Sequence, residues 1–245
     1  MIYATGDLHG HYRENRFPDM SENDYGIICG DFGVIWGDDH DDIGLNYLSE
    51  HTVGILLFVD GNHECFPKIY DYPVIEWNGG LVHQIRPNIL HLMRGYVYTV
   101  EDKKLFVMGG ATSIDKMWRI EGYSWWPEEI PTEEEFQRGR DNLAACDWNV
   151  DYVFTHSAPN DIHDKILDHI QAYSKKHDAV TSYLQEIDNR LTYKHWYCGH
   201  YHDEYKIDDK HTLLYYTTEE VGVSDNDNTG KQFESENSET NSAAL

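Results

Sequence analysis

The stretch GILLFVDGNHE, residues 54–64, joins an apolar run to four residues that pack poorly. The run 54–59 has strand length and is rich in β-branched and aromatic side chains, so it predicts a buried strand. Asn and His are costly to bury without hydrogen-bond partners. A tight turn accounts for Gly61, and at most for Asn62 as well, but not for His63. The polar residues therefore need a second explanation.

Four other apolar runs end in the same way. Polar residues follow the runs 2–5, 25–29, 54–59, 151–155 and 195–198, and they are Asp7, His9, Asp31, Asn62, His63, His156, His200 and His202. Each signal alone is weak, because Gly-Asp and Gly-Asn are ordinary turns and a lone histidine is commonly structural. The carboxyl ends of strands form the ligand crevice in α/β folds. Together, the five strand ends indicate one site.

The residue types at these strand ends are typical of a metal site. Oxygen and imidazole ligands without thiolate suit Mn, Fe, Zn, Ni or Co, whereas Mg and Ca sites use fewer histidines. Two ions about 3.5–4 Å apart need a ligand that spans both, and the carboxylate of Asp31 can do so. We therefore expect two divalent transition-metal ions, manganese first, which would hold a hydroxide nucleophile and clamp phosphoryl oxygens.

The order of the remaining patterns predicts an α/β sandwich. Further strands are expected at 81–86, 89–92, 96–100 and 104–108, and helices at 41–51, 132–146, 162–175 and 178–191. Strands alternate with helices at both ends of the chain and dominate its middle. Thr132 and Glu135 form a capping-box pattern, and the apolar residues of the last helix recur at helical spacing.

Composition narrows the possible functions. The chain has 44 Asp plus Glu against 19 Lys plus Arg, a formal charge of −25. This charge argues against generic binding to nucleic acid and would repel anionic substrates unless a bound metal reverses the local field. No apolar segment approaches the length of a membrane span and no signal peptide is evident, so we expect a cytoplasmic protein without a membrane partner.

We expect one domain over residues 1–223. Residues 224–245 are polar and aperiodic, which predicts a disordered acidic tail. The four cysteines show no CxxC spacing, so buried free thiols are expected.

Taken in order, GDLHG (6–10), GD (30–31), GNHE (61–64), TH (155–156) and GHYH (199–202) resemble the calcineurin-like metallophosphoesterase superfamily. The resemblance covers residues 2 to about 215 and implies a four-layer αββα sandwich with a dinuclear metal site at the carboxyl ends of the strands. The implied ligands are Asp7, His9, Asp31 and His202 for one ion, and Asp31, Asn62, His156 and His200 for the other.

The resemblance also implies an activity, hydrolysis of a phosphomonoester or phosphodiester by a metal-bridging hydroxide. Asp31, Asn62 and His63 would be the catalytic residues. His63 would bind neither ion and would protonate the leaving-group oxygen. The partner would be a small phosphorylated substrate or a nucleotide, and the oligomeric state stays open.

The second motif departs from one branch of this superfamily. Phosphoprotein phosphatases continue it as GDxxDRG, whereas this chain has GDFGVIWG, with Val34 and Ile35 in place of the Asp and Arg. The chain therefore resembles bacterial or phage members that lack this element. Another carboxylate would have to orient His63, and the candidates are Asp38, Asp39, Asp60 and Glu64.

The segment GGATSIDKMWRIEGYSWWPEEIP, residues 109–131, has two interpretations. It could be a packed surface loop held by its tryptophans. It could instead be a lid over the metals that supplies the phosphate contacts missing from the second motif. The candidate substrate-binding residues are Arg119, Lys116, Trp125, Trp126 and, from its place near Asp7 and His9, His11.

Two alternative functions remain open. A metal-binding recruitment module without turnover would be expected to lose His63 or several ligands, and all eight residues are present. A nuclease of the same superfamily would be expected to carry a basic stripe, which this acidic chain lacks.

Overall fold

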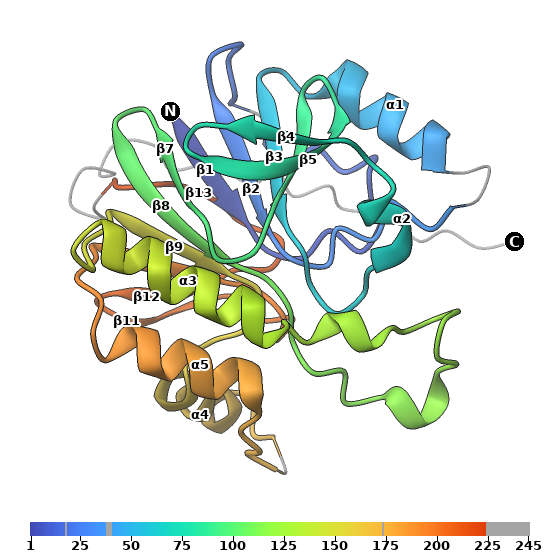
Figure 1. Ribbon diagram of the computed structural model, residues 1–245. Helices are drawn as coiled ribbons and strands as arrows, with labels where there is room; N and C mark the ends of the chain where they lie inside the picture. The colour runs from blue at the N-terminus through green and yellow to red at the C-terminus, as the bar shows by residue number, and fades with distance from the viewer. Residues whose placement is uncertain (18, 38–40, 173, 224–245) are drawn as a thin grey trace, which may run out of the picture.

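A computed structural model describes residues 1–17, 19–37, 41–172 and 174–223. The predicted tail, 224–245, and the candidate carboxylates Asp38 and Asp39 lie outside these residues. The fold is α/β, as predicted, with two mixed sheets flanked by helices (Figure 1). None of the helices in the described ranges is long and apolar enough to cross a membrane.

The first sheet has seven strands around a parallel centre. Its order is β13 (Thr218–Glu220), β1 (Ile2–Thr5), β2 (Tyr25–Cys29), β3 (Ile55–Val59), β6 (Ile89–Leu92), β5 (Gly80–Arg86) and β4 (Val74–Trp77). Strands β1, β2, β3 and β6 are parallel, and β13, β5 and β4 pair antiparallel to their neighbours. The carboxyl ends of β1, β2 and β3 therefore meet at one edge of this sheet.

The second sheet repeats this arrangement with six strands. Its order is β11 (Tyr205–Asp208), β12 (His211–Leu213), β10 (His195–Cys198), β9 (Tyr152–Thr155), β8 (Lys103–Met108) and β7 (Val97–Val100). Strands β12, β10, β9 and β8 are parallel. The ends of β9 and β10, which carry the other predicted ligands, therefore share an edge as well.

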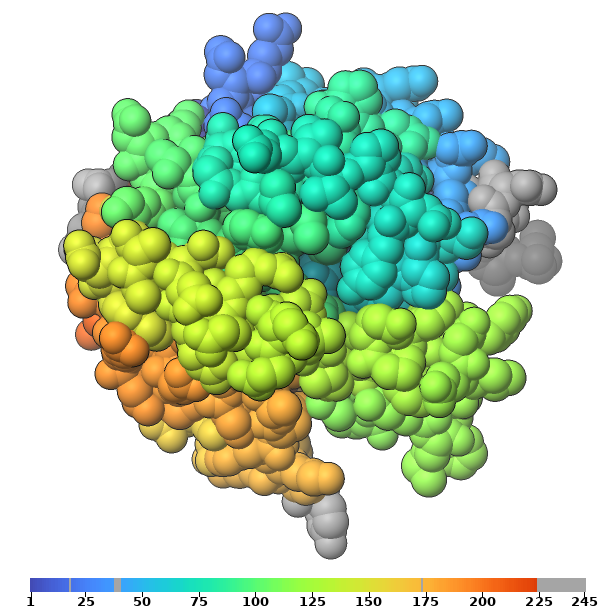
Figure 2. Space-filling view, in the orientation of Figure 1, coloured from blue at the N-terminus to red at the C-terminus, as the bar shows by residue number. Residues whose placement is uncertain are grey.

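Helices cover the outer faces of the two sheets (Figure 1). They are α1 (Asp41–His51) and α2 (Phe66–Tyr70) on the first sheet, and α3 (Glu133–Ala145), α4 (Asn160–His169) and α5 (Ala179–Asp188) on the second. Two short 3₁₀ turns, Lys116–Trp118 and Pro127–Glu129, interrupt the segment 109–131. This segment protrudes from one side of the molecule (Figure 2).

Apolar side chains fill the space between the sheets and beneath the helices. Ile27 and Leu57 from the first sheet share one buried cluster with Phe154 from the second, which places a core between the two sheets. The predicted apolar face of α5, including Leu184 and Ile187, is buried against the other side of the second sheet. Burial of these faces is the main favourable contribution to folding.

Some element boundaries differ from the predictions. The expected helix 162–175 is α4, which begins at Asn160 and ends at His169, and Gln171 has a positive φ of 54° that is incompatible with continuing a helix. Helix α2 and strands β4, β11, β12 and β13 were not predicted, because each has only three to five residues and no clear periodicity. The capping box is confirmed, since Thr132 and Glu135 accept each other's backbone N–H.

The cysteine prediction is confirmed for three positions. All four cysteines are free, and Cys29, Cys65 and Cys198 are buried, whereas Cys146 is partly exposed. Cys29 and Cys198 are the last residues of β2 and β10, directly before the predicted ligands.

A buried ion pair joins the elements next to the strand ends. Asp60 follows β3 directly, and its Oδ2 accepts hydrogen bonds from Arg94 Nε at 2.8 Å and Nη2 at 2.5 Å. His91 Nε2 lies 3.0 Å from the other oxygen. Burial alone would raise the pKa of Asp60, but Arg94 and His91 outweigh it and hold this pKa well below its usual range. The carboxylate therefore stays charged in the core.

The same pair holds both ends of the segment 109–131. The Gly110 N–H donates to the Asp60 carbonyl at 3.0 Å, and Arg94 Nη2 donates to the Glu128 carbonyl at 2.8 Å. Arg94 also lies 3.3 Å from Glu135 at the start of α3. The base of the protruding segment is thus attached to the core beside the end of β3.

We expect Asp60→Asn to destabilise the fold by about 3–5 kcal/mol, because it removes the closer and fully buried counter-ion of Arg94 and leaves the partly exposed Glu135 at 3.3 Å. Urea denaturation would measure the change. The matched control is Glu186→Gln, which removes one of the two carboxylate partners of Arg140 at the surface and should cost less than about 1 kcal/mol. Equal losses in the two variants would contradict the importance of the buried pair.

Candidate metal centre

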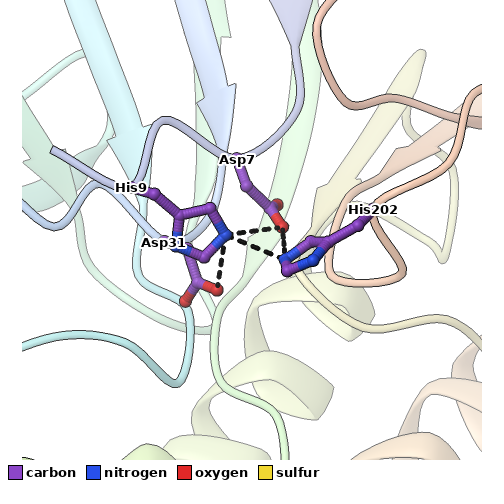
Figure 3. A group of neighbouring side chains, drawn as sticks. All are labelled: Asp7, His9, Asp31 and His202. Atoms are coloured by element: carbon purple, nitrogen blue, oxygen red, sulfur yellow. Dashed lines mark hydrogen bonds and ion pairs between the residues drawn. The ribbon is translucent and has the colours of Figure 1, made fainter. Parts of the chain in front are cut away.

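Four of the predicted ligands converge at the edge where the two sheets meet. Asp7 and His9 follow β1, Asp31 follows β2 and His202 follows β10. One ligand atom from each side chain lies within 4.8 Å of the others. Figure 3 shows the four side chains pointing toward one another. Both carboxylates are buried, His9 is partly buried and the His202 side chain is 49% exposed.

The spacing of these atoms fits a shared cation. His9 Nε2 lies 2.8 Å from His202 Nε2 and 3.7 Å from Asp31 Oδ2. Asp7 Oδ2 lies 3.6 Å from His9 Nε2 and 3.3 Å from His202 Nε2. Metal–ligand bonds of about 2.0–2.2 Å place neighbouring donor atoms roughly 3–3.5 Å apart. The four side chains could therefore hold one divalent cation with little rearrangement.

Asp31 carries the clearest sign of an additional ligand. Its Oδ2 is buried and has no hydrogen-bond partner. Its Oδ1 accepts the backbone N–H of His63 at 2.7 Å and lies 3.4 Å from His156 Nε2. Buried carboxylate oxygens rarely lack a partner, and such an exception needs an explanation. A cation beside Oδ2 would supply it.

A second group of predicted ligands surrounds His156. Its Nε2 lies 3.1 Å from Asn62 Oδ1, and its ring centroid is 4.8 Å from that of His200. Its Nδ1 lies 3.0 Å from the carbonyl of Cys29, which can only accept, so Nδ1 carries the proton. In the neutral form that metal ligation requires, Nε2 bears a lone pair that faces another acceptor, the Asn62 oxygen. A cation would relieve this opposition of two acceptors.

The charge of Asp7 and the protonation state of His200 suit metal ligation. Burial would raise the pKa of Asp7, but His156, His202 and His9 lower it well below its usual range, so Asp7 is anionic. Burial, reinforced by His156, lowers the pKa of His200 well below its usual range, so His200 is neutral. Ligating imidazole must be neutral and ligating carboxyl must be ionised.

The backbone at this edge is strained. His9, Asp31, His200 and His202 have positive φ angles of 49°, 41°, 77° and 53°. Non-glycine residues rarely occupy this left-handed region, and each instance costs of order 1 kcal/mol or more. Such strain concentrates at functional sites, where the surrounding structure imposes it.

Two motif glycines allow the ligands to approach the backbone. A Cβ on Gly30 would lie 1.9 Å from His156 Nδ1, and a Cβ on Gly61 would lie 2.0 Å from Asp31 Oδ1. Any side chain at either position would displace a predicted ligand. This close approach explains the glycine of GNHE, which the sequence alone assigned only to a turn.

Arg119 reaches the centre from the protruding segment. Its Nη2 lies 2.8 Å from Nδ1 and 3.1 Å from Nε2 of His63. Asp115 pairs with the Nε of Arg119 at 2.7 Å, and the carbonyl of Ser124 accepts from Nη1 at 3.1 Å. His63 in turn stands edge-on to His9, with ring centroids 5.2 Å apart. A forked cation is therefore present beside the ligands.

Neither described candidate carboxylate orients the imidazole of His63. Asp60 pairs with Arg94, and Glu64 accepts backbone N–H groups from Phe32 at 2.6 Å and Gly33 at 3.1 Å. The structure thus excludes both from that role. Burial lowers the pKa of His63, Asp31 opposes this shift and Arg119 adds to it, with a net lowering. His63 is accordingly neutral near pH 7 in this state.

The other predicted substrate-binding residues have partners outside the ligand groups. Lys116 pairs with Glu129 at 2.6 Å and lies over the ring of Trp125. Trp126 is buried in a small apolar cluster with Trp36, so its ring is not exposed to a substrate. His11 is exposed and pairs with Glu14.

Two contacts that the sequence did not reveal support the ligands. Tyr215 stacks on His202, with ring centroids 4.9 Å apart and an interplanar angle of 18°. Arg16 donates to the carbonyls of Tyr215 at 2.8 Å and Asp7 at 3.4 Å. Neither residue belongs to a motif, so only their proximity in the fold identifies them.

Comparison with known proteins does not assign this centre. A scan against protein-family models finds no match, and a search of curated proteins finds none significantly similar to the chain. The residues and their geometry are therefore what indicates a function.

We expect Mn²⁺ to stabilise the protein, by about 2.7 kcal/mol at a free concentration 100 times the dissociation constant. Asp31→Asn should lose the most metal, because it removes the charge shared by both ligand groups. Metal analysis after dialysis and thermal melts with and without EDTA would measure both effects. The control is His169→Ala, an exposed histidine on α4 that should keep full metal content. Wild-type metal content in Asp31→Asn would contradict the assignment.

Proposed function

We propose that this protein is a metal-dependent phosphoesterase of the calcineurin-like metallophosphoesterase superfamily, a four-layer αββα sandwich that binds two divalent transition-metal ions. The observation that carries the proposal is the position of Asp31 between two ligand groups. Its unpartnered Oδ2 faces His9, and its Oδ1 faces His156. This is the arrangement required of a carboxylate that bridges two cations.

The substrate would be a phosphomonoester or phosphodiester. When bound, the two ions supply the Lewis acidity that activates water and neutralises charge on phosphoryl oxygens. As metal ligands, the carboxylates of Asp7 and Asp31 would compensate part of the metal charge. The metals in turn explain how a chain of net charge −25 could accept an anionic substrate.

His63 would act as the general acid for the leaving-group oxygen. It lies beside both ligand groups, because its backbone N–H donates to Asp31 and its ring contacts His9 edge-on. The guanidinium of Arg119 disfavours protonation of the imidazole in the substrate-free state. A phosphate group would attract Arg119 and replace a positive neighbour of His63 by a negative one, which raises the pKa of His63.

The alternatives explain less of the geometry. A metal-binding module without turnover would have no use for the contact between His63 and Arg119. A nuclease would need a basic surface for the nucleic-acid backbone, which the composition disfavours.

We expect His63→Gln to keep both metals and to lose about 10²–10⁴-fold in rate on esters with poor leaving groups. The loss should be much smaller on p-nitrophenyl esters, whose leaving group scarcely needs a proton. Steady-state kinetics on an alkyl and an aryl ester with Mn²⁺ would compare the two. An equal loss on both esters would indicate a binding role for His63 instead.

We expect Arg119→Ala to lower kcat/KM by an amount that corresponds to about 2–4 kcal/mol of transition-state stabilisation, the scale of one lost donor. Removing the guanidinium should also raise the pKa of His63, so the fall in rate at high pH should shift to higher pH. Profiles of the rate against pH would measure this shift. Metal content and melting temperature should stay unchanged. Arg190→Ala, an exposed arginine over Trp148, is the control. Early melting with normal activity per folded molecule would show a structural role only.

A further inference from the structure

The amide of Asn62 can serve the proposed function in only one orientation. A side-chain amide binds a cation through its oxygen, whereas its NH₂ group has no lone pair to offer. Asn62 Oδ1 lies 3.1 Å from His156 Nε2, and Nδ2 lies 3.0 Å from Ser113 Oγ. A half-turn of the amide would place NH₂ at the ligand position. Some contact must therefore fix the orientation.

Ser113 and Glu129 together provide that contact. The hydroxyl of Ser113 has a single proton, and Glu129 Oε2, which lies 2.6 Å away, takes it because a carboxylate can only accept. Ser113 Oγ is then left as an acceptor toward Asn62 and selects its NH₂ group. The direction of this chain of hydrogen bonds is set by the charge of Glu129.

Glu129 is a buried carboxylate whose donors, among the described residues, come from its own segment. Its side chain is 0% exposed, and it accepts from Ser113 N at 3.0 Å, from Ser113 Oγ and from Lys116 at 2.6 Å. Burying a carboxylate is costly even when it is paired. Its place at the end of the chain Asn62–Ser113–Glu129 gives it a purpose.

We infer that Ser113 and Glu129 position Asn62 for the second cation, which makes the base of segment 109–131 a structural part of the metal centre. This inference rests on the proposed function, because it requires the second ion. Both ends of the segment are already attached beside β3, through Asp60 and Arg94. The exposed part includes Ile114, which is 96% exposed, and Trp118, which is 82% exposed.

The inference separates two roles of the segment. Arg119 contacts His63, whereas Ser113 acts through Asn62 and contacts no substrate, so it is a positioning residue. A segment that opened as one rigid lid would withdraw the acceptor of Asn62 and weaken the second metal site. Metal affinity, measured without substrate, is therefore the appropriate readout.

The test is calorimetric titration of the metal-free full chain with Mn²⁺, in wild type, Ser113→Ala, Ser113→Thr and Glu129→Gln. Ser113→Ala should lower the affinity for the second ion by about 10–100-fold and leave the affinity for the first unchanged. This is the usual effect of removing a contact that orients a ligand. Ser113→Thr keeps the hydroxyl and should restore the affinity. Glu129→Gln should lower the affinity for the same ion, because the amide of the introduced glutamine can donate to Ser113 Oγ. The hydroxyl proton of Ser113 is then free to point toward Asn62.

Ser124→Ala is the matched control, since it removes a hydroxyl from the same segment that bonds only to Ile120 among the described contacts. It should bind both ions as wild type does. If wild type binds two ions and both Ser113→Ala and Glu129→Gln bind them equally well, the inference alone is overturned. If wild type binds fewer than two, the dinuclear proposal fails and this inference fails with it. Circular dichroism would confirm that each variant is folded.

Discussion

The site depends on one constraint, the burial of the carboxylates of Asp7 and Asp31 beside the ligand histidines. Asp7 and Asp31 lie at the edge where both sheets end, each about 1% exposed, and one oxygen of Asp31 has no hydrogen-bond partner. Two negative charges at such a position are costly unless cations or donors compensate them. The left-handed backbone at four ligands adds to this cost. The fold holds the ligands in this costly arrangement, and bound cations would offset its cost in free energy.

This arrangement comes from the parallel centres of the two sheets. Strands β1, β2 and β3 end side by side in one sheet, and β9 and β10 do so in the other, so loops distant in sequence converge at one edge. The core between the sheets, which includes Ile27, Leu57 and Phe154, packs the two sheets together and so holds their ligand-bearing edges side by side. Parallel strands place their carboxyl ends together, which is why this edge carries the ligands.

The segment after β8 brings to the candidate site a cation that the second motif does not contain. Ile35 in the second motif is buried, and Arg119 brings a guanidinium to His63 from this segment. Because β8 is adjacent to β9, the chain that leaves it passes the end of the strand that carries His156. Ser113 and Glu129 form the buried base of the segment, with Lys116 paired to Glu129, so the segment combines support for Asn62 with a contact to His63.

The sequence by itself determined most of the strands, the long helices and the residues at the strand ends, because period-2 and period-3.6 patterns and short motifs are local properties. It also identified Arg119 as a cation near the site. Only the tertiary structure decided that Asp60 and Glu64 serve Arg94 and the backbone rather than His63, and that Ser113 reaches Asn62. These contacts join residues tens of positions apart, and no local pattern encodes a hydrogen bond between loops that meet only when two sheets pack.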